Sequence, residues 1–374
     1  MAMTLDGSNG VTFNDASLQG AAASPYVLKN RIINGDMVIS QRNGTSSVTP
    51  TNTQYTLDRW RFDLNQASKF TVQQNAGAVT PPVGFSKYLG VTSSSAYSVG
   101  ATDYFTSYQP IEGFNTADLS WGTANAKTIT ISAWVRSSLT GTFGGTVFNE
   151  NADRCYVFTY SIPTANTWTQ ISVTIAGDTS GTWTGATNGI GMYVGFAIGA
   201  GSTASGTAGI WGSTFYRSAT GAVSVVGTNG ATFYLTGVQL EIGTTATPFE
   251  RRLYGQELIN CLRYYEKSYD IGTSVGAATS NGQRVSSGNT GTNTTSEITT
   301  SCEFSVKKRI GPTVVIYDAV GNAGKCTRTN IGVGNFDNEV AASVLSSENN
   351  VFVYSNTGTN AGIMRYHFTA SAEL

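Results

Sequence analysis

Hydrophobic and polar residues alternate with a period of two along much of the chain. In KTITISAWVRS, Ile129, Ile131 and Val135 share one face, and Trp134 lies on the other. The segments RCYVFTYSI, TWTQISVTIAG and TFYLTGVQLEIG repeat the same alternation. This pattern is typical of half-buried strands, and no helical period separates them. We therefore expect an antiparallel jelly-roll β-sandwich over residues 30–253.

The pattern changes to a helical period at residues 254–270. Leu258, Leu262, Tyr265 and Tyr269 follow the spacing i, i+4, i+7, i+11, which places them along one stripe of a connecting helix of about four turns. This helix can pack on the sandwich with its charged face in solvent. Alternatively, the four residues of the stripe form a contact between subunits of an oligomer.

Two segments flank this region. Residues 1–29 contain GVTFNDASLQG, which predicts a small hairpin that turns at Asn14-Asp15 and is followed by a linker. Residues 271–374 begin with a tract rich in Gly, Ser, Thr and Asn and continue with strand patterns such as EFSVKKRIGPTVVIYDAV. We expect a second, smaller β-sandwich domain there. The predicted fold class is therefore all-β.

An aspartate interrupts an apolar run in NRIINGDMVISQRNG, residues 30–44. Ile32 and Ile33 precede Asn34-Gly35, and Asp36 follows that turn-forming dipeptide. We interpret the stretch as the opening strand of the jelly roll, with Asp36 as a turn or bulge residue.

Composition narrows the function classes. Charged residues make up 12% of the chain, the formal net charge is −1, and no run of apolar residues is long enough to span a bilayer. Nucleic-acid binding and membrane insertion are therefore not expected. The four cysteines lie far apart and no export signal is visible, so we expect reduced thiols and folding in a cytosol.

Catalytic chemistry has few candidate residues. His367 is the single histidine and lies in a strand pattern near the end of the chain, so we expect a structural role for it. No His and Cys residues have zinc-ligand spacing. A glycosidase needs only two carboxylates, and Glu112, Asp118, Glu150 and Asp153 are candidates that the sequence cannot pair. We predict that the chain is not an enzyme, with a glycosidase as the alternative.

Tryptophans in Gly-rich segments are candidates for sugar contacts. Trp121, Trp183 and Trp211 have small polar neighbours, and an indole ring can stack on the apolar face of a sugar. The alternative is that each ring plugs the end of the sandwich. Trp134 and Trp168 lie inside patterned strands, so we assign them to the core.

Several stretches occur together in a familiar order: NRIINGDMVISQRNG, YTLDRWRF, YQPIEG, LSWGTANAKTITISAWVRSS, NTWTQISVTIAGDTSGTW and LTGVQLEIGTTATPFERRLYGQELINCLRYYEKSY. They resemble a family of tailed-bacteriophage virion proteins, mainly tail-fibre or receptor-binding proteins, whose central domain is similar to a carbohydrate-binding-module jelly roll. The likeness covers residues 30–270. The N-terminal GVTFNDASLQG and the C-terminal YHFTASAEL are similar to elements of the same proteins.

The resemblance implies a non-enzymatic virion component that adheres to host surface polysaccharide or another receptor. It also implies a homotrimer, contact with other phage virion proteins through the N-terminus, and assembly in the host cytoplasm. No cofactor is implied, but some related jelly rolls hold a structural calcium, for which Asp36 and Glu241 would be the ligands. Alternatives are a capsid decoration or head-fibre protein and a host-polysaccharide depolymerase. Polar loops at 273–296 and 346–361 are further candidates for receptor contact.

Overall fold

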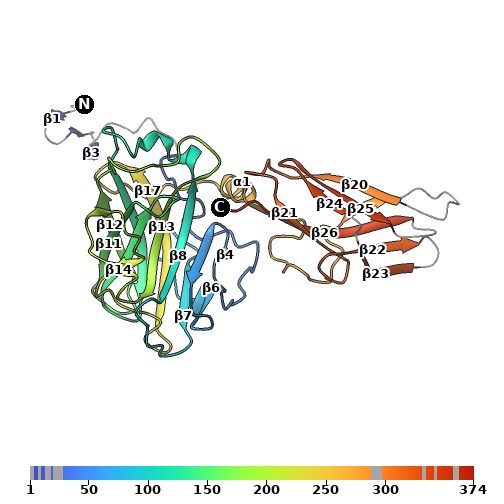
Figure 1. Ribbon diagram of the computed structural model, residues 1–374, viewed down its shortest axis with the longest axis horizontal. Helices are drawn as coiled ribbons and strands as arrows, with labels where there is room; N and C mark the ends of the chain where they lie inside the picture. The colour runs from blue at the N-terminus through green and yellow to red at the C-terminus, as the bar shows by residue number, and fades with distance from the viewer. Residues whose placement is uncertain are drawn as a thin grey trace.

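The computed structural model shows two β domains side by side, with a short helix and the C-terminus between them (Figure 1). It describes residues 4–6, 10–12, 18–19, 28–287, 297–330, 334–340, 343–356 and 362–374. The all-β prediction is confirmed, because the described chain is built almost wholly from antiparallel sheets. No helix in this part of the chain has the length and apolar character needed to cross a bilayer.

The larger domain is a sandwich of two antiparallel sheets. The seven-stranded sheet contains, in spatial order, β15 (Trp211–Gly212), β11 (Cys155–Ile162), β10 (Gly141–Phe148), β13 (Ile190–Ala200), β8 (Tyr104–Glu112), β5 (Trp60–Leu64) and β4 (Gln54–Leu57). The five-stranded sheet contains β12 (Thr169–Ile175), β9 (Ile129–Ser137), β17 (Thr232–Ile242), β7 (Leu89–Ser93) and β6 (Phe70–Gln74).

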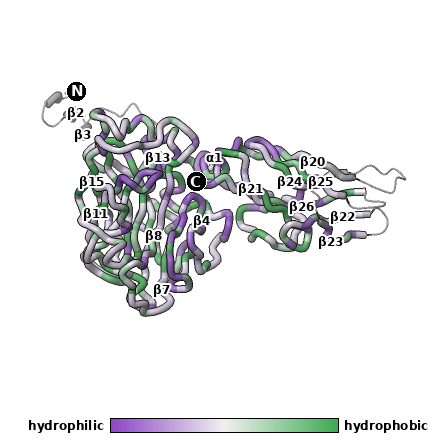
Figure 2. The backbone as a smooth tube through the Cα atoms, in the orientation of Figure 1, coloured by the Kyte–Doolittle hydropathy of each residue, from purple (hydrophilic) through white to green (hydrophobic). Residues whose placement is uncertain are grey.

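The core lies between these two sheets, where the inward residues of each strand meet. Ile129, Ile131 and Val135 of β9 are fully buried there, as their alternation predicted. Hydrophobic and polar positions alternate along the strands of both domains (Figure 2). Burial of this apolar area is the main stabilising contribution to the fold. Other members of the core are Trp60, Phe62, Phe105, Phe143, Val194, Phe196, Leu235 and Val238.

Short elements connect the strands. The 3-10 helices are η1 (Ala76–Ala78), η2 (Gly113–Asn115) and η3 (Ala117–Leu119). A small parallel pair, β14 (Ser205–Gly206) and β16 (Ser218–Ala219), lies in the segment between β13 and β17. At the N-terminus, β1 (Thr4–Asp6), β2 (Gly10–Thr12) and β3 (Leu18–Gln19) form a three-stranded sheet, in which β2 and β3 pair as the predicted hairpin requires. The rest of the predicted segment 1–29, except residues 28–29, lies outside the described residues.

The segment 30–44 is not a regular strand, so the prediction of an opening strand is wrong. Its backbone is held largely by side chains: Ile32 N–H donates to Asn30 Oδ1 at 3.0 Å and Ile39 N–H donates to Asn34 Oδ1 at 2.9 Å. Asp36 lies in a turn that closes with a hydrogen bond from Met37 N–H to the Asn34 carbonyl at 3.2 Å. The interpretation of Asp36 as a turn residue is therefore confirmed.

The connecting helix is shorter than predicted. Helix α1 spans Tyr254–Leu262, and the next residues form β18 (Tyr265–Lys267), which pairs with β26 (Ile363–Ser371). Tyr265 and Tyr269 are 6% and 3% exposed within their own chain, so they cannot serve as the predicted oligomer contact on a helical stripe. The pairing of β18 with β26 and the burial of both tyrosines override the helical spacing. Leu258 and Leu262 do lie on α1 and are half-buried.

The C-terminal domain also consists of two sheets. One contains β18, β26, β22 (Lys325–Asn330) and β23 (Gly334–Val340), with β19 (Arg284–Ser287) and β21 (Thr313–Tyr317) also pairing with β26. The other contains β20 (Glu297–Glu303), β25 (Asn350–Asn356) and β24 (Ser343–Ser346). Phe304, Ile316, Val353, Tyr366 and Phe368 belong to its small core.

Charged groups fasten the two domains together. Glu112, at the end of β8 and 2% exposed, accepts hydrogen bonds from Arg263 Nε at 2.9 Å and from the Tyr264 hydroxyl at 2.6 Å. Glu373 pairs with Arg42 at 3.0 Å and also with Arg59. Because these partners come from both domains, the junction places the C-terminus against the seven-stranded sheet.

Candidate functional site

The three tryptophans predicted to contact sugars lie together at one end of the sandwich. Their rings pack edge-to-face, with centroids 4.7 Å apart for Trp121 and Trp183, 5.3 Å for Trp121 and Trp211, and 5.6 Å for Trp183 and Trp211. Trp121 is 7% exposed and belongs to the core, whereas Trp183 and Trp211 are half-buried. Each ring thus covers part of another.

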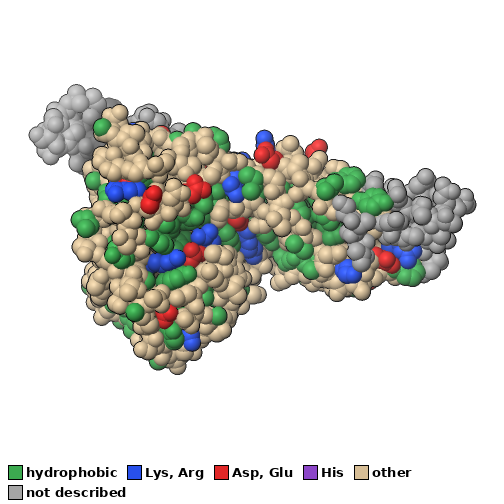
Figure 3. Space-filling model, in the orientation of Figure 1, with side chains coloured by type: hydrophobic (Ala, Val, Ile, Leu, Met, Phe, Trp, Pro, Cys, Tyr) green, Lys and Arg blue, Asp and Glu red, His purple; other side chains and the backbone are tan. Residues whose placement is uncertain are grey.

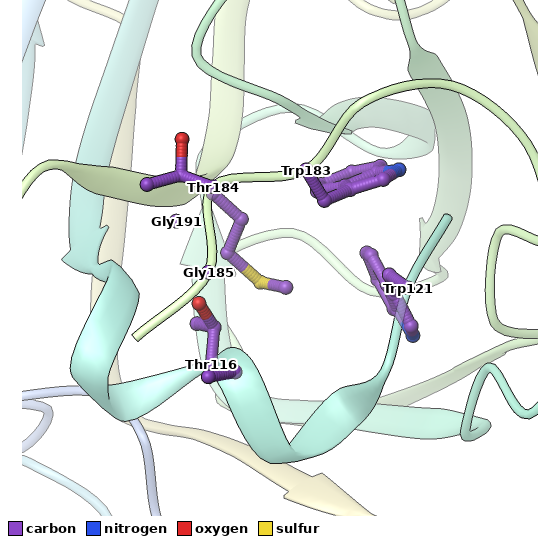
Figure 4. Close-up of a pocket in the computed structure, with 8 residues that line it drawn as sticks. Thr116, Trp121, Trp183, Thr184, Gly185 and Gly191 are labelled. Carbon is purple, nitrogen blue, oxygen red and sulfur yellow. The ribbon is translucent and has the colours of Figure 1, made fainter. Parts of the chain in front are cut away.

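The polar atoms of these indoles are already engaged. Trp121 Nε1 donates to the Lys127 carbonyl at 2.7 Å, and Trp211 Nε1 donates to the Ala176 carbonyl at 2.8 Å. A pocket of about 50 Å³ lies beside the rings, with Trp121 and Trp183 on one side and Thr116 and Thr184 on the other (Figure 4). This arrangement supports packing at the end of the sandwich, and the role of these tryptophans in sugar binding stays a prediction.

The predicted calcium ligands are in different surroundings. Glu241 accepts hydrogen bonds from Gln239 Nε2 at 2.8 Å and from the Thr247 hydroxyl at 2.6 Å. Asp36 instead faces Glu257, and burial, together with that neighbouring charge, raises the pKa of Asp36. Within the described ranges, no three His, Cys, Asp or Glu side chains converge to hold a metal ion. A calcium ion at Asp36 and Glu241 stays a prediction.

The outer face of the seven-stranded sheet carries a different group of side chains. In β5, Trp60, Phe62 and Leu64 point into the core, and Arg61 and Asp63 between them point outward. Basic, acidic and apolar side chains lie next to one another in a hollow on this side of the sandwich (Figure 3). Because alternate residues of a strand lie on the same face, Arg61 and Asp63 place two opposite charges on one surface.

Asp63 is shared between two arginines. Its carboxylate lies 2.9 Å from Arg61 Nε and 3.4 Å from Arg217 Nη1. Arg217 comes from the segment just before β16 and stacks on Tyr104 of β8, with its guanidinium carbon 3.7 Å from the ring centre. The three charged side chains are 11–17% exposed, so they can be reached from solvent although they are mostly packed.

Aromatic rings form the floor beside this charged group. The guanidinium carbon of Arg61 lies 5.4 Å from the ring centre of Tyr193 in β13. The Tyr193 ring stacks on Phe148 of β10, and their ring centres are 4.4 Å apart. Tyr108 of β8 lies flat against β13, where its register partner is Gly195. A Cβ at Gly195 would come within 2.2 Å of the Tyr108 ring, so this position requires glycine. The C-terminal residue borders the hollow, because the Leu374 carbonyl accepts a hydrogen bond from Arg61 Nη1 at 3.2 Å.

The electrostatics of this group follow from packing and pairing. Burial is the strongest single influence on Arg61 and works against its charge, but Asp63, Tyr55 and Tyr193 together raise the pKa of Arg61. Burial also raises the pKa of Tyr193, although Arg61 beside it acts in the opposite direction. The surface presents two guanidinium donors and one carboxylate acceptor beside the half-buried Tyr104, whereas Tyr108 and Tyr193 are buried beneath them. Such donors and acceptors suit the hydroxyls of sugars.

The sequence contained part of the signal for this group. In WRFDL, two opposite charges occupy the outward positions of a strand, which is informative in a chain with only 12% charged residues. Tyr104 and Tyr108 likewise alternate along β8. Arg217 carries no comparable pattern, because an irregular segment brings it over the sheet.

The other predicted residues have structural surroundings. His367 is fully buried, lies 3.8 Å from the Tyr269 ring and hydrogen-bonds to Ser268 and the Thr279 carbonyl. Trp134 and Trp168 are half-buried on the outer face of the five-stranded sheet and lie outside the core between the sheets, although Trp168 packs against a small buried cluster of Ala76, Tyr88 and Tyr234. The loops 273–296 and 346–361 lie in part outside the described residues, which omit 288–296 and 357–361.

Comparisons with known proteins give fold neighbours and no family. No family model and no curated protein matches the chain. Among solved structures, the enzymatically active domain of tailspike protein 4 of bacteriophage CBA120 is similar over 57% of this chain and 22% of its own, with 12% identity and a TM-score of 0.32. The chain thus spans about a fifth of that protein's length.

Sugar-binding proteins also occur among the similar structures. A putative sugar binding protein from Bacteroides thetaiotaomicron matches 57% of this chain and 100% of its own length, with 11% identity and a TM-score of 0.33. The TmCBM61 module in complex with β-1,4-galactotriose matches 57% of this chain and 99% of its own length, with 9% identity and a TM-score of 0.29.

Proposed function

We propose that this chain is a structural virion protein of a tailed bacteriophage, a tail-fibre or receptor-binding subunit that adheres to host surface glycans. The observation that supports glycan binding is the outward group of Arg61, Asp63 and Arg217 over Tyr104 and Tyr193. Such a group offers guanidinium donors and a carboxylate acceptor within one hollow, held in place by the aromatic rings against which they pack. The phage assignment is supported by the ordered sequence stretches that resemble virion proteins.

We further propose that the chain is not an enzyme. Among the described residues, Asp36, Glu250 and Glu257 line one small cavity, and Glu257 contributes to the raised pKa of Asp36. That cavity has a volume of about 10 Å³, which is room for about one water molecule and not for a sugar ring. Binding without cleavage is therefore the favoured role.

The proposal includes a homotrimer that attaches to other virion proteins through the N-terminus. On α1, Tyr254 and Ile259 are 52% and 48% exposed, and the preceding Leu253 is 84% exposed. These side chains, in place of the buried Tyr265 and Tyr269, can reach a partner subunit. Light scattering at micromolar concentration should give a trimer mass, and a clean monomer would count against the fibre assignment.

A glycan array tests the binding function. The native chain should bind a set of host-derived oligosaccharides, and the R61Q/R217Q variant should lose binding to neutral members by about tenfold or more in Kd. Thermal unfolding of both proteins controls for folding. Absence of binding by the native chain, or full binding by a folded R61Q/R217Q variant, would overturn the proposal.

Immunogold labelling of virions tests the location. Labelling of tails is expected, whereas labelling of heads would replace the tail assignment with a capsid decoration or head-fibre protein. Incubation of the chain with host polysaccharide should release no new reducing ends, and their appearance would reveal a depolymerase.

A further inference from the structure

The outer face of the five-stranded sheet carries a second group of aromatic and basic side chains. Trp134 and Arg136 lie two residues apart on β9 and are half-buried, whereas Val135 between them is fully buried. Arg136 is the register partner of Tyr234 in β17, and its guanidinium carbon lies 5.3 Å from the centre of that ring. Trp168, just before β12, packs against Tyr234 with centroids 6.4 Å apart. Rings and a cation therefore share this side of the sheet.

Two phenylalanines extend the group. Gly237, at the bulge of β17, has a φ of 61°, and a Cβ there would meet Phe85 at 2.7 Å and Trp134 at 3.2 Å. Phe85 packs against Phe249, with ring centres 5.2 Å apart. The guanidinium carbon of Arg251 lies 4.5 Å from the Phe85 ring centre. We name this set the aromatic–cation surface: Phe85, Trp134, Arg136, Trp168, Phe249 and Arg251, with the buried Tyr234 beneath Arg136 and Trp168.

The guanidinium groups of this surface lack a close carboxylate. In the described part of the chain, the ion pairs within 4.0 Å include neither Arg136 nor Arg251. Arg136 Nε donates to the Asn166 carbonyl at 3.0 Å. Arg251 is exposed and acts on Asp36 only as the smallest of several influences on its pKa. Both cations are therefore available to an anion from solvent.

We propose that the aromatic–cation surface binds an anionic polysaccharide, with uronic acid units as the recognised groups. This inference rests on the glycan-binding function proposed above and adds a second site of different charge to it. Uronate carboxylates pair with Arg136 and Arg251, whose planar guanidinium groups match carboxylates in two parallel hydrogen bonds. The apolar faces of the sugar rings stack on Trp134 and Phe85. A neutral polysaccharide gains only the stacking and binds this surface more weakly.

Charge complementarity distinguishes this surface from the hollow on the other sheet. There, Asp63 already neutralises part of the charge of Arg61 and Arg217. Here, both guanidinium groups lie beside aromatic rings, and Arg136 donates to the Asn166 carbonyl through Nε, so a ligand would meet its Nη groups. An acidic chain therefore prefers the five-stranded face, and raising the salt concentration weakens that binding because the pairs form near solvent.

Affinity electrophoresis in gels that contain polygalacturonate tests the proposal, with dextran gels as the neutral comparison. Polygalacturonate should retard the native chain, and the R136Q/R251Q variant should bind it at least about tenfold more weakly. Trp134→Ala should also weaken the binding. The K307Q/K325Q variant removes two positive charges from the C-terminal domain and should bind like the native chain. Thermal unfolding confirms that each variant is folded.

The outcomes separate this inference from the proposed function. Retardation that R136Q/R251Q abolishes and R61Q/R217Q retains supports the second site. Retardation that R136Q/R251Q retains, or equal loss in K307Q/K325Q, overturns it, as does absence of retardation of the native chain. In these cases binding of neutral glycans on the array, sensitive to R61Q/R217Q, leaves the proposed function intact.

Discussion

The two outer faces of the sandwich use similar residue types in opposite ways. On the seven-stranded face, Arg61 and Arg217 pair with Asp63 and lie over tyrosines. On the five-stranded face, Arg136 and Arg251 rest on aromatic rings and have no carboxylate within 4.0 Å in the described residues. A single acidic residue therefore accounts for most of the chemical difference between the two faces.

This difference shows how a chain poor in charge can present two faces of distinct charge. Paired charges have their fields largely cancelled and act mainly as hydrogen-bonding groups, which suits neutral sugars. Unpaired guanidinium groups retain their long-range attraction for anions. The scaffold is the same β-sandwich in both cases, so single substitutions can change the charge of one face and leave the other face intact.

The largest expected effect comes from the domain junction, where Glu112 of the seven-stranded sheet meets Arg263 and Tyr264. Glu112→Ala removes the acceptor for Arg263 and Tyr264 and should lower the free energy of unfolding by about 2 kcal/mol, since Arg263 remains partly hydrated. Chemical denaturation measures this loss. Binding of neutral glycans should weaken as well, because Leu374 and Arg61 share a contact at the hollow. Unchanged stability would contradict the role of Glu112 as a fastener.

The next effect separates the two faces directly. Arg217→Ala should weaken binding of neutral glycans by about tenfold, because the stacking on Tyr104 and a donor are both lost. Binding of polygalacturonate should not change. Arg136→Ala is the matched control and should give the reverse pattern. Equal losses of both ligands in either variant would show that the faces are not independent.

A smaller effect is expected from changing the charge of the seven-stranded face. Asp63→Asn leaves Arg61 and Arg217 without their carboxylate, so the seven-stranded face becomes cationic. Polygalacturonate binding at low salt should increase by a few-fold, and the gain should disappear at high salt. Titration calorimetry at two salt concentrations measures it. No gain at low salt would contradict the idea that pairing with Asp63 sets the preference.

The smallest effect concerns pH and lies outside both faces. Burial lowers the pKa of His367 below its usual value near 6.5. Just below pH 6.5, His367 is therefore protonated in the unfolded chain but still neutral in the folded chain. The stability of the C-terminal domain should therefore be fully present above about pH 6.5 and fall as the pH drops through that value. Melting temperatures between pH 7.5 and 5 should decrease by a few degrees. His367→Gln should remove this pH dependence, and its persistence would assign the effect to another group.

Much of the fold could be predicted because strand alternation is a local signal. The core positions of β9 followed directly from KTITISAWVRS. The helix was overestimated because Tyr265 and Tyr269 have a helical spacing, while their actual partners, β26 and His367, come from about a hundred residues later in the chain. Such long-range pairing cannot be read from a local period.

The candidate site was less predictable for the same reason. Tryptophans in Gly-rich segments are natural candidates for sugar contacts, but Trp121, Trp183 and Trp211 pack on one another. Arg217 meets Asp63 only because an irregular segment folds back over the sheet. Trp134 was correctly placed opposite Ile131, yet the sequence could not show that the opposite face of that strand lies outside the sandwich core.

A crystal structure with a neutral oligosaccharide selected on the array tests the central claim most directly. The account predicts sugar density in the hollow of the seven-stranded sheet, in contact with Arg61, Tyr193 or Arg217. Density confined to the pocket beside Trp121 and Trp183, with an empty hollow, would contradict it.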